Sequence, residues 1–321
     1  MTNPCEINDR KVAVIGCGFV GAASAFALMQ SGLFSEMVLI DSDPSKAEGE
    51  AMDISHGEAY ARPMKIYAGT YDDITDAAII IITAGANQKP GETRLDLVQK
   101  NVGIFKTIIP EIKKRNYNGI LLVVANPVDV LTYTALKLSG LPENRVLGSG
   151  TVLDTARFRE ILGNHLNVDS RSVHAFIVGE HGDSEIAVWS TANVAGVPIN
   201  KFCELRGHFN HQEAMKRIAR DVKNAAYEII TRKKATYFGI AMAVKRICEA
   251  IVRDEKSVLP VSNLMHGAYG IDDITLSMPA VVGRNGIELQ MPISLDGNEA
   301  LALKASADML KKIIQNVKIE N

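Results

Sequence analysis

The chain contains seven histidines, and one of them, His181, lies in a segment suited to chemistry. Histidine is the side chain whose ordinary pKa allows proton exchange near neutral pH. His181 belongs to the polar, glycine-flanked segment 179–184, which directly follows the apolar run 173–178. Because a turn after a strand exposes its side chains, an acid/base role is open for His181. A satisfied structural role is equally open from this pattern alone.

An acid/base histidine needs a buried carboxylate that fixes its tautomer and favours the imidazolium form. Asp154, in the segment 150–157, is a candidate for this partner, although it could instead cap the helix that begins there. Arg157 follows three residues later, on the same face of that helix. Its planar guanidinium suits a substrate carboxylate, and the alternative is a surface ion pair with Asp154.

The segment 16–21 reads GCGFVG, which fits the GxGxxG pattern of dinucleotide-binding folds. It follows an expected strand and opens an expected helix, and Asp41 comes 20 residues after Gly21 at the end of the next strand. Gly16 allows the tight turn, Gly18 lets a pyrophosphate approach the backbone, and Gly21 lets helix and strand pack closely. Asp41 would bind the adenosine ribose hydroxyls and repel a 2′-phosphate, which favours NAD over NADP. The alternatives are a glycine-rich turn with Asp41 as a helix cap, and a methyltransferase that binds another adenosine cofactor.

In the first half of the chain, short apolar runs alternate with helical stretches, and these elements must position the glycine-rich segment and Asp41. Because the runs are apolar on both faces, they suit a parallel sheet that helices cover on both sides. We predict an α/β fold whose first domain, residues 1–148, is a Rossmann doubly wound parallel sheet that binds NAD. The expected strands are 12–15, 37–40, 66–68, 79–83, 120–124 and 146–147, and the first helix is expected to stop near Gly32.

The second half, residues 149–321, has a different pattern and is expected to form an α+β substrate domain. Its last expected helix, 298–317, is amphipathic. A long helical region at 212–253 is expected to break near 231–235. The other expected elements are a helix at 155–162, a strand at 173–178, and antiparallel strands at 257–263 and 287–290.

Composition excludes several classes of protein. The 35 basic and 37 acidic side chains give a net charge of −2, which offers little attraction for nucleic acid or an anionic membrane. No run reaches the ~18 apolar residues of a membrane-spanning helix, and the N-terminus lacks a signal-peptide pattern. The four cysteines form no CxxC pair, which argues against a disulfide framework or a zinc site. We expect a cytoplasmic protein with no nucleic-acid partner, no membrane partner and no bound metal.

Six motifs occur in order along the chain: GCGFVG, ITAGANQKPGETRLDLVQKN, VVANPVDVLTY, GSGTVLDTARFR, VGEHGDSE and KKATYFGIAM. Together they resemble the lactate/malate dehydrogenase family, and within it the bacterial NAD-dependent L-lactate dehydrogenases. The resemblance implies reversible hydride transfer between NADH and pyruvate, giving L-lactate and NAD+, in a homotetramer. The alternatives are a malate or broad 2-hydroxyacid dehydrogenase, and an NAD-binding structural or regulatory protein without turnover.

The resemblance also implies roles for individual residues. His181 would be the acid/base, oriented by Asp154, while Arg94 would polarise the substrate ketone from a mobile loop at 85–94 that closes over the substrate. The bond before Pro127 is cis in the family. Substrate contacts fall on Arg157, Gln88, Asn126 and Thr236, and cofactor contacts on Gly16, Gly18, Phe19, Val20, Gly21, Asp41, Asn126 and Ile240.

Gln88 occupies the position at which the family distinguishes its substrates. A malate enzyme neutralises the second carboxylate of its substrate with an arginine there. Gln88 has no charge, so oxaloacetate would leave a buried carboxylate unpaired, at a cost of several kcal/mol. The methyl group of pyruvate carries no such penalty, and we therefore predict pyruvate and lactate as the substrates.

Two further expectations follow from the resemblance. Arg159 and His174 fall where bacterial members bind fructose 1,6-bisphosphate at a subunit interface, and they could form either a regulatory site or a structural anion or interface site. Lys233 and Lys234 precede Thr236 where related chains commonly have a glycine. We expect a less kinked helix at this point.

Overall fold

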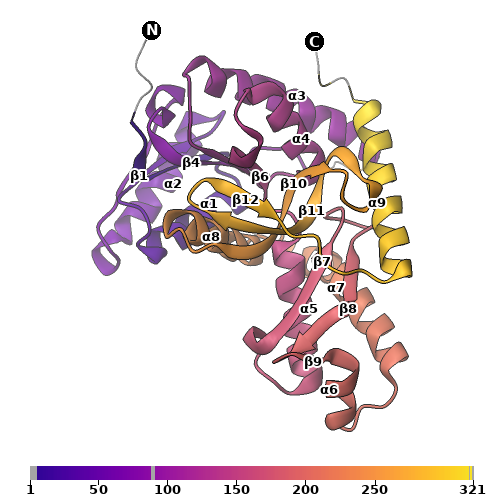
Figure 1. Ribbon diagram of the computed structural model, residues 1–321. Coiled ribbons are helices and arrows are strands. Elements are labelled where there is room, and N and C mark those ends of the chain that lie inside the picture. Colours follow the sequence, from indigo (N-terminus) through magenta and orange to yellow (C-terminus); the bar gives the residue numbers. More distant parts are fainter. Residues whose placement is uncertain (1–5, 88–90, 318, 320–321) are drawn as a thin grey trace.

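The computed structural model describes residues 6–87, 91–317 and 319 (Figure 1). One sheet of nine strands runs through the molecule in the order β12-β11-β10-β6-β5-β4-β1-β2-β3, and a smaller sheet has the order β7-β8-β9. The strands of the large sheet are β1 (Asn8–Ile15), β2 (Glu36–Ile40), β3 (Lys65–Ala68), β4 (Ala77–Ile82), β5 (Ile120–Val123), β6 (Val146–Gly148), β10 (Ser257–His266), β11 (Asp272–Gly283) and β12 (Gly286–Gln290).

The six strands predicted in the first half of the chain are all present, and they pair in parallel. β1 lies between β2 and β4, so the strand order reverses beside β1. In an open parallel sheet this reversal leaves a crevice at the carboxyl ends of the strands, where ligands bind. The predicted Rossmann fold is confirmed, and the loops that follow β1, β2, β4 and β5 meet at this crevice.

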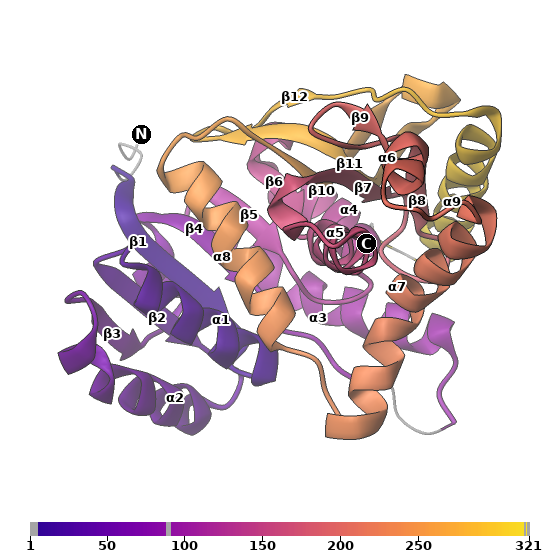
Figure 2. The same cartoon turned by 90° about the horizontal axis from the view of Figure 1, so that it is seen from below.

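Helices cover both faces of the parallel strands because alternate side chains point to opposite sides. On β4, Ile79 and Ile81 belong to the apolar cluster that includes residues of α1, α2 and α8, whereas Ile80 and Ile82 belong to the cluster with α3, α4 and α9. Figure 2 shows α1 and α8 side by side on one face and α3 on the other. The helices are α1 (Phe19–Ser31), α2 (Pro44–His56), α3 (Arg94–Lys114), α4 (Val128–Ser139), α5 (Val152–Leu166), α6 (Ile199–Leu205), α7 (His211–Lys233), α8 (Phe238–Val252) and α9 (Gly297–Gln315).

The strands predicted near the C-terminus extend the same sheet instead of forming a separate one. β10 pairs antiparallel with β6 through Ser262 and Gly148, and β11 and β12 follow in antiparallel order. The sheet therefore crosses the predicted domain boundary at residue 148, and that boundary stays a prediction. The pattern of single strands carried no information about this pairing.

The smaller sheet forms the lower lobe in Figure 1. It contains β7 (Val173–Val178), β8 (Ile186–Val194) and β9 (Val197–Pro198), all antiparallel. The strand at 173–178 was predicted. β8 was not, because polar residues such as Ser190 and Asn193 interrupt its apolar pattern. The core of this lobe joins α5, α6 and α7 to the sheet through Phe158, Leu162, Ile177, Cys203 and Ile218.

The expectation of a less kinked helix near Lys233 is wrong. α7 ends at Lys233, and Lys234 takes a left-handed conformation with φ +71°, the geometry that glycine usually provides at a helix end. The Lys233 ammonium lies 3.5 Å from the ring centre of Tyr237 and 4.2 Å from that of Phe238, which stabilises the turned chain. The predicted break between the two helices is thus present even with lysine at the turn.

None of the helices in the described residues is long and apolar enough to span a bilayer.

Candidate functional site

The glycine-rich segment joins β1 to α1 at the crevice. Gly16 has φ +102°, and a Cβ atom there would lie 2.5 Å from the backbone nitrogen of Ala84. A Cβ atom at Gly21 would overlap the carbonyl oxygen of Gly16, so strand and helix approach more closely than any other residue allows. At Gly18 a Cβ atom would meet no atom within 4 Å, and no side chain caps the start of α1. The helix start is therefore open to an anionic group such as a pyrophosphate.

Asp41 follows β2 and faces this segment. Its carboxylate accepts N–H bonds from Cys17 at 2.6 Å and from Asp43 at 3.0 Å. Burial opposes its ionisation, but these N–H groups outweigh burial and hold the pKa of Asp41 below its usual range. The helix-cap alternative is wrong, because Asp43 caps α2 by accepting the N–H of Ser45. An ionised carboxylate beside the glycine turn fits a ribose diol, so these residues together fit NAD.

Asn126 lies after β5, next to Pro127, and the bond between them is cis. Its position is held by Asn101, a buried residue of α3 that the sequence analysis missed. The Asn101 amide donates to the carbonyl oxygen of Asn126 at 2.7 Å and accepts the N–H of Ala86 at 2.7 Å. It therefore joins the loops that follow β4 and β5. Asn101 is the last residue of the second of the six motifs, and this position was the feature of the sequence that could have indicated its role.

The structure brings His181, Asp154 and Arg157 together, although His181 comes 27 residues after Asp154 in the sequence. Asp154 lies in the first turn of α5, and His181 lies in the turn after β7. One Asp154 oxygen is 2.6 Å from Nδ1 of His181, and the other accepts a hydrogen bond from Arg157 at 2.7 Å. The side chains of Asp154, Arg157 and His181 are 3%, 14% and 25% exposed.

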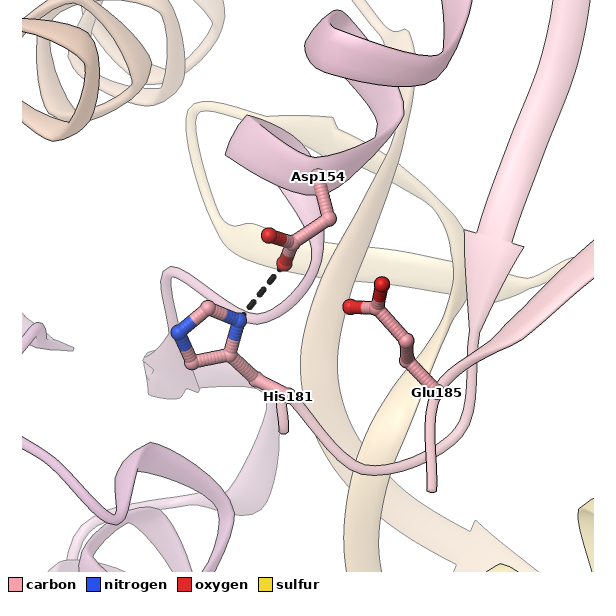
Figure 3. A group of neighbouring side chains, drawn as sticks. All are labelled: Asp154, His181 and Glu185. Carbon is pink, nitrogen blue, oxygen red and sulfur yellow. Dashed lines mark hydrogen bonds and ion pairs between the residues drawn. The ribbon is translucent and has the colours of Figure 1, made fainter. Parts of the chain in front are cut away.

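Charge in this group favours the imidazolium form of His181. Burial lowers the pKa of His181, but the Asp154 carboxylate outweighs burial and raises it to about 9. Burial likewise opposes the ionisation of Asp154, and the charges of His181 and Arg157 overcome it and lower the pKa of Asp154. Figure 3 shows the second ring nitrogen of His181 pointing away from Asp154. That nitrogen, Nε2, is placed to exchange a proton with a ligand.

Asp129 of α4 supports the histidine turn from the other side and was also missed. It is 1% exposed, and its carboxylate accepts the backbone N–H of His181 at 2.8 Å and the hydroxyl of Ser262 at 2.6 Å. Burial raises its pKa to about 6. Asp129 lies in the third motif, three residues after Asn126. It therefore fixes the backbone that carries the imidazole.

Glu185, just before β8, is a second carboxyl beside the pair. One ligand atom from each of Asp154, His181 and Glu185 lies within 4.8 Å of the others, and the Glu185 carboxyl points toward the pair (Figure 3). This spacing also suits a metal ion. However, the Asp154 oxygens already bind His181 and Arg157, and a cation from Arg157 opposes a second cation there. The arrangement is therefore better suited to proton exchange than to metal binding.

The remaining predicted contacts lie at the break between α7 and α8. Thr236 is in the break itself, next to Tyr237, whose ring stacks on Phe19 with 5.4 Å between ring centres. Phe19 begins α1 and is 69% exposed. Ile240 of α8 and Val20 of α1 pack against the same apolar cluster. The break thus lies next to the glycine-rich segment, although the two are more than 200 residues apart in the sequence.

Two predicted residues have no described side chain. Gln88 lies outside the described residues, and the side chain of Arg94 does too. Arg94 is the first residue of α3. Thr93 caps this helix, because its side chain accepts the N–H of Asp96. Arg94 therefore begins a helix instead of lying within the loop.

The two predicted effector residues lie on one side of the lower lobe. Arg159 of α5 donates from Nε to the carbonyl oxygen of Ala175 at 3.0 Å, and its guanidinium lies over the Phe176 ring at 5.2 Å. Burial lowers the pKa of Arg159. His174 is exposed, two residues before Phe176 on β7, and alternate strand residues share a face. Both side chains thus lie at the same face of β7.

Comparisons with known families match almost the whole chain. The model of the lactate/malate dehydrogenase NAD binding domain matches residues 10–148, and the model of the lactate/malate dehydrogenase alpha/beta C-terminal domain matches residues 151–321. Each half that the sequence analysis distinguished is therefore similar to one part of the same family.

Individual relatives give the same result. The L-lactate dehydrogenase of Acetivibrio thermocellus is 54% identical over 310 residues, which are 97% of this chain and 98% of the relative. L-lactate dehydrogenase 1 of Clostridium acetobutylicum is 52% identical over 309 residues, 96% of this chain and 99% of the relative. The crystal structure of the minor L-lactate dehydrogenase from Enterococcus mundtii in the ligands-bound form has a TM-score of 0.94 and 46% identity, and covers 97% of this chain and 99% of that chain.

Proposed function

Because the chain belongs to the lactate/malate dehydrogenase family, we propose that its activity is NAD-dependent L-lactate dehydrogenation and that the residues described above carry it out. The reaction is the reversible interconversion of pyruvate and L-lactate. The observation that supports this proposal most directly is the contact of Asp154 with both His181 and Arg157, which places a proton donor and a carboxylate-binding cation side by side.

The cofactor would bind at the crevice between β1 and β4. Bound NADH supplies the hydride that reduces the keto carbon. The open start of α1 at Gly18 would receive the pyrophosphate, and Asp41 would bind the adenosine ribose. Gly16 and Gly21 allow the tight turn and the close packing that place this helix start at the crevice. The remaining cofactor contacts that we propose come from Phe19, Val20, Asn126 and Ile240.

His181 would donate its Nε2 proton to the substrate oxygen as that oxygen gains negative charge. The Asp154 carboxylate accepts the hydrogen bond from Nδ1–H of His181, which fixes the tautomer, and its charge stabilises the imidazolium before donation. In lactate oxidation the same nitrogen would accept the hydroxyl proton. Arg157 would bind the substrate carboxylate through two parallel N–H bonds and so orient the keto carbon.

The other contacts that we propose complete the substrate pocket. Arg94 would stabilise the developing charge on the ketone oxygen. Asn126 and Thr236 would contact the substrate from the loops after β5 and α7. We expect the loop that precedes α3, of which residues 88–90 lie outside the described residues, to close over the substrate and exclude water from the pocket.

The choice of substrate would depend on Gln88. We expect Gln88→Arg to raise kcat/KM for oxaloacetate and to lower it for pyruvate, changing their ratio by on the order of 10², because only the arginine pairs with the second carboxylate. NADH oxidation with pyruvate and with oxaloacetate measures this ratio, and in the unchanged protein it tests the lactate proposal itself. Oxaloacetate preference in the unchanged protein would favour the malate alternative.

Asn87→Arg is the matched control, because it introduces the same charge at the preceding, exposed position. We expect this control to leave the ratio near that of the unchanged protein. An unaltered ratio in Gln88→Arg would contradict the role given to Gln88.

Arg159 and His174 support the proposal of an effector site for fructose 1,6-bisphosphate in a homotetramer. An arginine and a histidine at one face of β7 offer N–H donors that suit a bisphosphate. We expect the sugar bisphosphate to lower KM for pyruvate, and His174→Gln to weaken this effect without changing turnover in its absence. Saturation curves with and without the effector measure it, with fructose 6-phosphate as the control ligand.

Identical saturation curves would instead favour a structural anion or interface site. Sedimentation tests the tetramer separately. Location in the cytoplasm stays a prediction.

A further inference from the structure

Glu185 is a half-buried carboxyl group to which the proposed reaction gives no role. In the part of the chain that the structure describes, no side-chain hydrogen bond or ion pair engages its carboxyl. One of its carboxyl oxygens nevertheless lies within 4.8 Å of a carboxyl oxygen of Asp154 and of a ring nitrogen of His181, and the carboxyl group points toward them (Figure 3). A carboxyl so close to a proton-carrying imidazole changes the proton affinity of that imidazole whenever its own charge changes.

We propose that Glu185 is a positioning residue for the His181 proton: it holds a second, exchangeable proton beside the His181–Asp154 pair and, on losing it, keeps His181 protonated to higher pH. This inference rests on the proposed function and adds to it a determinant of the pH range of the reaction.

Charged groups from three elements face Glu185. Asp154 and Arg157 lie on α5, His181 lies in the adjacent turn, and Lys223 lies on α7. Burial and the Asp154 charge raise the pKa of Glu185 to about 8, against the opposing effect of the cations. At neutral pH Glu185 and His181 are therefore both protonated, while Asp154 is ionised. The buried Asp129, on the other side of His181, also raises the pKa of His181.

A cavity of about 260 Å³ gives Glu185 a route for proton exchange that does not pass through the substrate pocket. Glu185, Arg220, Lys223 and Asn224 supply its polar lining, and Ile177, Ala187 and Ala219 the apolar part. A proton lost from Glu185 thus passes to solvent beside α7. The Nε2 atom of His181 remains available to the substrate throughout, because Glu185 lies on the Nδ1 side (Figure 3).

Glu185→Gln removes the charge that forms above neutral pH while keeping the shape of the side chain. We expect the alkaline limb of kcat/KM for pyruvate reduction, which needs protonated His181, to move down by about 1 pH unit. The acid limb of lactate oxidation, which needs neutral His181, should move down by the same amount. A side chain with only a structural role would lower both rates without moving either limb.

Binding and spectroscopy test the same shift without turnover. Oxamate, an isostere of pyruvate that accepts no hydride, should bind the NADH complex with a pH dependence displaced by the same amount. Difference infrared spectra should show a protonated carboxyl that titrates near pH 8 in the unchanged protein and is absent in Glu185→Gln. In Lys223→Met that carboxyl should titrate at higher pH, because a cation that favours its ionisation is gone.

Glu228→Gln is the matched control, because it removes an exposed glutamate of α7 whose partner is Arg232. Its pH limbs should coincide with those of the unchanged protein. Unmoved limbs in Glu185→Gln, in a protein that still interconverts pyruvate and lactate, would overturn the role of Glu185 alone. Absence of lactate dehydrogenase activity in the unchanged protein would instead overturn the proposed function.

Discussion

Replacing His181 by asparagine should reduce kcat for pyruvate reduction by on the order of 10³ to 10⁴ and leave NADH affinity nearly unchanged. Asparagine has a similar polar reach but no proton to transfer at neutral pH, so the developing alkoxide would have to take its proton from water. The Asp154 carboxylate would also lose the cation that it stabilises. The cofactor contacts that we propose lie elsewhere, at the glycine segment and Asp41.

Steady-state assays measure the loss of turnover, and quenching of protein fluorescence by NADH measures cofactor affinity. His56→Asn is the matched control, because His56 is an exposed histidine at the end of α2. It should behave like the unchanged protein. Turnover of His181→Asn near that of the unchanged protein would show that another group supplies the proton.

Replacing Arg157 by lysine should lower kcat/KM for pyruvate by on the order of 10² to 10³. Lysine keeps the positive charge beside Asp154, but it presents a point charge where the guanidinium offers two parallel donors to a carboxylate. The substrate would bind more weakly and in more than one orientation, so KM should rise and kcat should fall as well.

Arg171→Lys provides the control for this change. Arg171 also pairs with an aspartate, Asp169, but its side chain is 88% exposed. The substitution there should leave both constants unaltered. A KM for pyruvate that is unchanged in Arg157→Lys would mean that the substrate carboxylate binds elsewhere. NADH affinity should be the same in both variants.

Local pattern was sufficient to predict much of the fold. The uninterrupted apolar runs around Ile79 and Leu121 predicted buried parallel strands, and the glycines at 16, 18 and 21 predicted the turn between β1 and α1. Gly32 ends α1 in a left-handed conformation, as expected for a helix that stops there. These features depend on residues close in sequence, which is why they could be read from it.

Features that depend on distant residues could not be predicted in the same way. The pairing of β10 with β6 joins Ser262 to Gly148, and neither strand carries a signal for the other. Asn101 and Asp129 were missed because each makes its contacts with residues that only folding brings near, and Glu185 was missed because only folding places it beside His181 and Asp154. All three lie inside recognised motifs, Glu185 as the last residue of VGEHGDSE, so attention to the polar residues within those motifs would have found them.

The candidate site was predicted in part because acid/base chemistry requires particular residue types, a histidine with a carboxylate partner. His181 stood out by its turn, and the structure adds the contact of Asp154 with both His181 and Arg157. The break after Lys233 shows the opposite case. A lysine at the helix end suggested a straighter helix, yet the packing of Lys233 on Tyr237 and Phe238 maintains the turn.

The continuous nine-stranded sheet limits how the two halves of the molecule can move. A hinge between residues 6–148 and the rest of the described chain would have to break the pairing of β6 with β10 and open the apolar cluster that α1 shares with α8. The glycine segment and His181 are therefore parts of one rigid frame. If the proposed function holds, we expect conformational change during turnover to be confined to surface segments, and the distance between the start of α1 and the His181 imidazole to be set when the chain folds.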